Sequence, residues 1–183
     1  MDDDPSPTGS RRGGGHAGAR RSAAATPSAA PVPALSVGVS SLVGRLPIAR
    51  GRVVAIAQAV LRGERCRAAA LAISFVPRAT MARLNRRYLG HRGATDIITF
   101  EHTAPAPGAP LVGDIYIAPA VAAENSRRYG GSVRAEVARL VIHGVLHALG
   151  WEHPEGEGEV RTRSAMWRRQ ERWLARLRED GTW

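Results

Sequence analysis

Residues 132–153 read SVRAEVARLVIHGVLHALGWEH, an apolar stretch that carries three histidines. Ser132 suits the N-cap of a helix, and apolar residues recur behind it with helical spacing. We therefore expect a helix over 132–149. His143 and His147 are four residues apart, which places both imidazoles on one face of that helix.

The third histidine follows the end of this helix. Gly150 can stop the helix and reverse the chain, so that His153 returns toward the other two. Three imidazoles are a zinc ligand set that leaves the fourth tetrahedral position open, as catalytic zinc sites do. Other first-row divalent ions accept the same ligands. We predict one Zn²⁺ per chain, bound by His143, His147 and His153 and acting through an activated water.

The residue after the first histidine separates this chain from a large class of zinc enzymes. The spacing H-x3-H-x5-H is also that of the metzincin peptidase signature HExxHxxGxxH, in which the Glu is the general base. Here that residue is Gly144, which argues against peptide hydrolysis. A general base would have to be Glu152, Glu155 or Asp114, or hydroxide on the metal itself. Asp114 could instead bond a ligand histidine from behind.

The charge of the chain indicates an anionic partner. Its 26 basic residues, all arginine, outnumber 16 acidic ones, for a formal net charge of +10. Such an excess favours nucleic acid. No apolar run approaches the ~20 residues of a membrane helix, and the acidic start Met1–Asp4 is unlike a signal peptide, so we expect no membrane association and a cytoplasmic location. Cys66 is the single cysteine, expected to be a small buried residue in a reducing compartment.

Composition divides the chain into two parts. Residues 1–34 are rich in Gly, Ala, Ser, Pro and Arg and have few large apolar side chains, so we expect a disordered tail. Residues 35–183 predict a single α+β domain, with one mixed four-stranded sheet, about five helices and the metal site at the end of a central helix. The expected strands are 35–43, 68–76, 95–100 and 111–117, and the expected helices are 48–61, 79–89, 119–129, 132–149 and 159–178.

Several segments together resemble one known family. HGVLHALGWEH at 143–153 resembles the HGxLHLxGYDH signature of the YbeY family, bacterial endoribonucleases that act in ribosomal RNA maturation. LNRRYLGHRGATDIITF at 84–100 resembles the family segment LNxxYRxxxxPTDVLSF, and LVGDIYIA at 111–118 resembles its LGDIxI strand. MWRRQERWL at 166–174 resembles a closing M-x-x-x-E helix through Met166 and Glu171.

This resemblance implies a function for the histidines. It implies an α+β fold with zinc on the three histidines, hydrolysis of single-stranded RNA, maturation of the 16S rRNA 3′ end and ribosome quality control. The implied partners are ribosomal RNA and the small ribosomal subunit, with no small-molecule cofactor. A basic surface that holds phosphates and a metal that activates water agree with that chemistry.

Three residues depart from the family pattern. Leu89 stands where the family has an arginine after its Tyr, Ala94 replaces a Pro, and Glu152 replaces an Asp. The missing positive charge could come from Arg86, Arg87, His91 or Arg92, of which the three arginines are candidate RNA-binding residues. The loss of the arginine also motivates an alternative function, a ribosome-associated assembly factor whose metal is structural and which binds RNA without cutting it.

Overall fold

The computed structural model describes residues 35–102, 109–154 and 164–183. The expected tail at 1–34 and Glu155 lie outside the described residues. Within the described part of the chain, no helix combines the length and the apolar character that crossing a bilayer requires.

Four strands form one mixed sheet, as the sequence predicts. They are β1 (Leu35–Ser41), β2 (Ala69–Phe75), β3 (Ile97–His102) and β4 (Leu111–Ile117), and their order in the sheet is β1-β2-β4-β3. β1, β2 and β4 run parallel, whereas β3 runs antiparallel to β4. β3 and β4 are consecutive in the chain and adjacent in the sheet.

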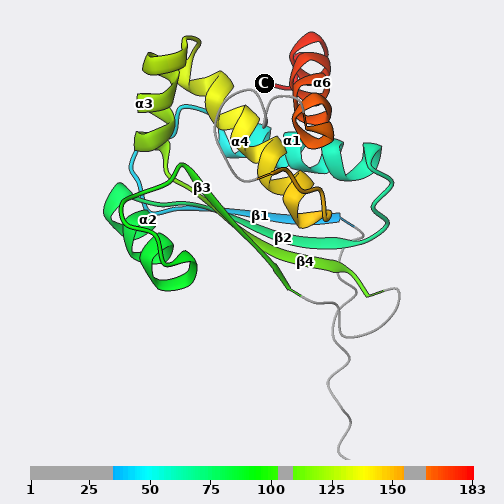
Figure 1. The fold of residues 1–183 in the computed structure, drawn as a ribbon. Helices are drawn as coiled ribbons and strands as arrows, with labels where there is room; N and C mark the ends of the chain where they lie inside the picture. The colour runs from blue at the N-terminus through cyan, green and yellow to red at the C-terminus, as the bar shows by residue number, and fades with distance from the viewer. Residues whose placement is uncertain (1–34, 103–108, 155–163) are drawn as a thin grey trace, which may run out of the picture. The chain divides into compact units, whose positions relative to one another are not determined.

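Three helices lie on one side of this sheet, two of them against the strands and the third packed outside them (Figure 1). They are α1 (Arg50–Gly63), α4 (Val133–Ala148) and α6 (Ala165–Glu179). α4 lies in the middle and packs against α1, α6, β3 and β4. The hydroxyl of Ser132 accepts a hydrogen bond from the backbone N–H of Ala135 at 3.1 Å, which confirms the expected N-cap.

The opposite face carries a smaller layer. α2 (Arg78–Leu84) continues into a π-helical turn, η1 (Asn85–Leu89), and both lie on the other side of the sheet from α4 (Figure 1). α3 (Pro119–Tyr129) contacts both α4 and α2. The second face has its own small core. That core consists of Val76, Met81, Ile98, Ala118 and Val121.

The main core lies between the sheet and the three helices of the first face. Strand residues alternate between the two faces, so Gly113, Ile115 and Ile117 of β4 face α4 while Asp114 and Tyr116 face the other way. α4 is buried along most of its length because it packs on several sides. The helix that carries the first two histidines is therefore fixed before any ligand binds.

Two sequence expectations about helices were wrong. The predicted helix 79–89 changes to a π-turn after Leu84, and this shifts the angular positions of the residues that follow. Tyr88 and Leu89, at the end of this turn, are 54% and 48% exposed. The last helix begins at Ala165 rather than Glu159, because Ser164 caps it by accepting a hydrogen bond from the N–H of Trp167 at 3.1 Å. Residues 159–163 lie outside the described ranges.

Candidate metal centre

The end of α4 brings the three predicted histidines together. The backbone N–H groups of Gly150 and Trp151 donate to the carbonyls of His147 and Leu146, at 2.8 and 3.0 Å. Gly150 has φ = +80°, a left-handed conformation that glycine adopts without a Cβ penalty. This turn returns the chain, and one nitrogen from each of His143, His147 and His153 lies within 4.8 Å of the others.

Each imidazole has an oxygen beside its Nδ1 atom. The Nδ1 of His143 lies 2.8 Å from Oε1 of Gln170, and the Nδ1 of His153 lies 3.0 Å from the carbonyl oxygen of Pro154. The Nδ1 of His147 lies 3.8 Å from a carboxylate oxygen of Glu152. An acceptor at Nδ1 favours the tautomer with the proton on Nδ1 and the lone pair on Nε2.

The charge state of the cluster also suits metal binding. Burial lowers the pKa of His147, and the neighbouring His153 lowers it further, while the Glu152 carboxylate opposes both effects. A lowered pKa keeps the imidazole of His147 neutral near pH 7. Neutral imidazole is the form that ligates a metal ion.

The residues present fit a zinc ion. The donor set is three imidazoles whose Nδ1 atoms face oxygens, which is the arrangement that holds ligand histidines in orientation. Nitrogen ligands of a tetrahedral zinc ion lie about 2.0–2.1 Å from the metal and therefore about 3.4 Å from one another. One nitrogen from each of the three histidines already lies within 4.8 Å of the other two, so small side-chain rotations would bring them to that spacing. The site could hold Zn²⁺ through His143, His147 and His153, and the donor set does not exclude another divalent ion.

Gln170 links the centre to a network between α4 and α6. Its side chain is 1% exposed, and its Nε2 donates to Glu171 Oε1 at 3.0 Å. The same oxygen of Glu171 accepts from Nε of Arg139 at 2.9 Å, and Arg139 also pairs with Glu136 on α4. The orientation of His143 therefore depends on contacts between two helices.

Sequence reasoning missed Gln170. The M-x-x-x-E resemblance was assigned through Glu171, but the fourth residue after Met166 is Gln170. Counting the spacing strictly would have found the residue that contacts His143. Nothing in the sequence indicates that its partner is a histidine 27 positions earlier.

Gly144 faces away from the imidazoles. A Cβ at this position would lie 2.7 Å from Cγ2 of Ile115 and 3.0 Å from Cδ1 of Ile97, both in the sheet. A longer side chain cannot fit between α4 and the sheet without displacing them. The absence of the peptidase Glu at this position therefore has a packing cause as well as a chemical consequence.

Asp114 does not lie beside the metal ligands, contrary to one expectation. Its carboxylate oxygen Oδ2 is 2.9 Å from Nε2 of His102. Both side chains lie on the sheet face opposite α4, because residues 112, 114 and 116 alternate with the residues that pack on that helix. The sheet thus separates Asp114 from His143, His147 and His153.

The candidate RNA-binding arginines lie on η1 and the loop after it. Arg86 and Arg92 line one pocket, of about 320 Å³, together with Arg83. Arg87 instead lies with its guanidinium carbon 5.5 Å from the ring centre of Tyr88. The buried side chain of Asn85 donates to the carbonyl of Gly93 at 3.0 Å and so ties the two ends of this segment together.

Several known proteins, all from one family, are similar in sequence to this chain. Residues 48–178 match the family described as Endoribonuclease YbeY. The protein of that name from Nocardia farcinica is 36% identical over 121 residues, 61% of this chain and 66% of the relative. The one from Rhodococcus erythropolis is 35% identical over 135 residues, 68% of this chain and 74% of the relative.

Two further matches cover more of the chain. The Endoribonuclease YbeY of Mycolicibacterium paratuberculosis is 32% identical over 151 residues, 77% of this chain and 85% of the relative. A solution structure of a Thermotoga maritima protein aligns with 80% of this chain and 94% of its own length, with a TM-score of 0.49 and 19% identity. The family match covers residues 48–178, well over half of the chain, so the chain belongs to the Endoribonuclease YbeY family.

Proposed function

We propose that this chain is a zinc-dependent endoribonuclease that hydrolyses single-stranded RNA. The observation that carries the proposal is the convergence of three imidazoles whose Nδ1 atoms each face an oxygen, in a member of this family. When bound, the ion would polarise a phosphoryl oxygen and lower the pKa of a water molecule. The residues of the chain supply orientation and charge around that ion.

Three groups orient the rings of the ligand histidines. Gln170 and the carbonyl of Pro154 accept from the rings of His143 and His153. The Glu152 carboxylate lies at the Nδ1 edge of His147, so it supports the ligand rather than facing the side where RNA would bind. These contacts favour a lone pair on the Nε2 atoms, so the three imidazoles need only small rotations to share one ion.

RNA binding is supported by the distribution of arginine. The net charge of +10 gives the chain a long-range attraction for a polyanion. Arg86 and Arg92, with Arg83, form a basic pocket that could hold a backbone phosphate and take the place of the arginine missing at Leu89. Arg87, beside Tyr88, is available for a further phosphate contact.

The family supports a cellular role. The relatives carry the name Endoribonuclease YbeY, and the sequence resemblance implies 16S rRNA 3′-end maturation and ribosome quality control. We place this chain in the cytoplasm, acting on ribosomal RNA with the small ribosomal subunit as its partner. The alternative, an assembly factor with a structural metal, is motivated by Leu89 and predicts RNA binding without cleavage.

One experiment decides between the two functions. Full-length protein loaded with Zn²⁺ is incubated with a labelled single-stranded RNA and with the matched duplex, beside His147→Ala purified in the same way. We expect cleavage of the single strand, loss on chelation, recovery on adding Zn²⁺, and no cleavage by His147→Ala. Equal cleavage by wild type and His147→Ala would indicate a contaminating nuclease. Tight RNA binding by zinc-loaded wild type with no cleavage would favour the assembly factor.

A further inference from the structure

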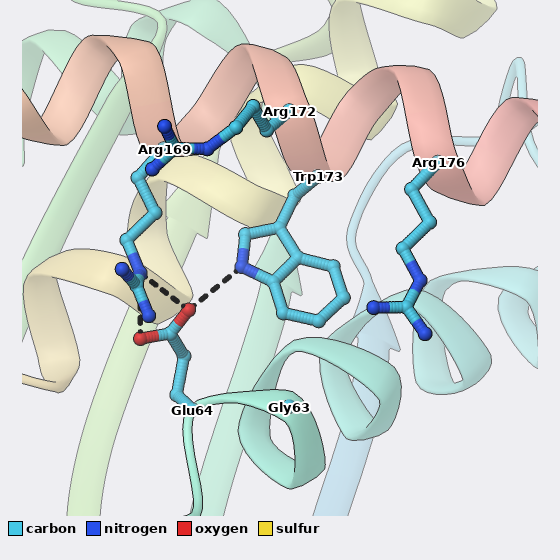
Figure 2. Close-up of a pocket in the computed structure, with 6 residues that line it drawn as sticks. All are labelled: Gly63, Glu64, Arg169, Arg172, Trp173 and Arg176. Atoms are coloured by element: carbon cyan, nitrogen blue, oxygen red, sulfur yellow. Dashed lines mark hydrogen bonds and ion pairs between the residues drawn. The ribbon is translucent and has the colours of Figure 1, made fainter.

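We propose that a cleft between α6 and the end of α1 is a second RNA-binding site, which holds backbone phosphates of the substrate outside the metal centre. The cleft encloses about 350 Å³. Figure 2 shows Arg169, Trp173 and Arg176 extending from α6 toward the end of α1, while Arg172 lies along α6 beside Arg169. The cleft is lined by Gly63, Glu64, Arg169, Arg172, Trp173 and Arg176.

A buried carboxylate builds the floor of this cleft. The side chain of Glu64 is 5% exposed. Its oxygens accept from Nε of Arg169 at 2.6 and 2.8 Å, and Oε1 also accepts from Nε1 of Trp173 at 2.7 Å (Figure 2). A Cβ on Gly63 would lie 2.1 Å from the Trp173 ring, so the indole packs directly on the α1 backbone. The floor is therefore ordered before a ligand arrives.

The remaining charge of the cleft is positive. Three arginines and one glutamate line it, and Glu64 is already paired with Arg169. Among the residues that the structure describes, no carboxylate lies within ion-pair distance of Arg172. Arg176 reaches only Asp180, at 3.9 Å, with both side chains more than half exposed. Such an exposed pair is weak, so two guanidinium groups remain for phosphate oxygens, which they bind as forked donors.

The cleft adjoins the metal centre through one turn of α6. The guanidinium carbon of Arg169 lies 4.6 Å from the ring centre of Trp151, in the turn between His147 and His153. The next residue on the helix, Gln170, contacts His143. A single RNA strand at the metal centre could therefore continue over α6 into the cleft. This choice of ligand rests on the proposed function.

RNA affinity tests the proposal independently of cleavage. Fluorescence anisotropy with a labelled single-stranded RNA is measured on full-length protein carrying His147→Ala, so that the probe stays intact. The cleft variant is Arg172→Ala/Arg176→Ala. The charge-matched control is Arg134→Ala/Arg178→Ala. Arg134 is exposed on α4, and Arg178 is more than half a helical turn from Arg176 and points away from the cleft.

We expect the cleft variant to bind RNA about 10-fold or more weakly at ~0.1 M salt, and the control to change less than about twofold. The slope of log affinity against log salt should fall by roughly 1.4, about 0.7 for each lost phosphate contact. Equal affinities and slopes for the two variants would overturn the proposal. Circular dichroism confirms folding, which substitution of two exposed arginines should leave intact.

The result is separable from that of the cleavage experiment. If zinc-loaded wild type fails to cut RNA, the nuclease function fails while the anisotropy comparison still decides whether the cleft binds RNA. If wild type cuts RNA and the cleft variant binds like its control, only the second site is overturned.

Discussion

The Nδ1 atom of His143 lies 2.8 Å from Oε1 of Gln170, although 27 positions separate the two residues in the chain. Gln170 is 1% exposed, and its amide nitrogen donates to Glu171. Because a buried amide must have both ends bonded, the Oε1 atom is directed at the imidazole. α6 therefore helps to set which nitrogen of His143 is available to a metal ion.

Replacing Gln170 with Leu should weaken zinc binding about 10- to 100-fold, the usual cost of removing a partner that orients a ligand histidine. Gln170→Glu should retain more zinc affinity than Gln170→Leu, because a carboxylate accepts the same hydrogen bond from His143, although it loses the donor to Glu171 and sets two carboxylates side by side. Competition against a fluorescent chelator measures both constants, and thermal melting of the metal-free proteins reports any packing defect. Wild-type affinity in Gln170→Leu would contradict an orienting role, as would equal losses in both variants.

The sequence predicted those parts of the site that depend on local spacing. The helix expected over 132–149 is α4, Val133–Ala148, and the four-residue separation of His143 and His147 is enough to place them together. The turn at Gly150 is also a local signal. Strict counting of the M-x-x-x-E spacing would have pointed to Gln170 but not to its partner, because the contact with His143 depends on how α6 packs against α4.

For the fold as well, local patterns could be predicted from the sequence, whereas packing between elements could not. Alternation and apolar runs predicted the four strands, and the structure moves their ends by up to two residues. The helix expected over 79–89 assumed regular α-helical spacing, whereas the chain forms a π-turn over Asn85–Leu89. The ring of Tyr88 packs at the sheet edge, with its centre 5.0 Å from that of Phe100. Asp114 was placed near the metal because nothing in the sequence states which sheet face α4 covers.

Gly144→Ala should lower the free energy of unfolding by about 1–2 kcal/mol. The new Cβ would lie 2.7 Å from Ile115, and overpacking of this kind costs about 1–3 kcal/mol, more than the gain in helix propensity of up to about 1 kcal/mol. Gly51→Ala is the matched control, since its Cβ would meet nothing within 4 Å on α1. That substitution should be neutral or stabilising. Urea denaturation measures the change in the free energy of unfolding for both variants. A similar change in the two would contradict the predicted overpacking at residue 144.

Asp114→Asn should leave zinc affinity within about twofold of wild type. The carboxylate pairs with His102 across the sheet from α4, so its charge is remote from the three ligand nitrogens. The same chelator competition used for Gln170→Leu provides the measurement, with that variant as the positive control. A loss of affinity like that of Gln170→Leu would mean that the sheet transmits a change at Asp114 to the metal.

Cys66 should react slowly with alkylating reagents near neutral pH. Partial burial raises the pKa of its thiol, with a smaller opposing effect from a backbone hydrogen bond at Ala68. A raised pKa leaves less thiolate, the reactive form, at pH 7.5, so the rate should climb as pH passes 9. Since Cys66 is the only cysteine, intact-mass spectra of the iodoacetamide-treated protein give its rate directly. We expect a rate below that of glutathione at pH 7.5, and a rate equal to it would show that burial does not protect the thiol.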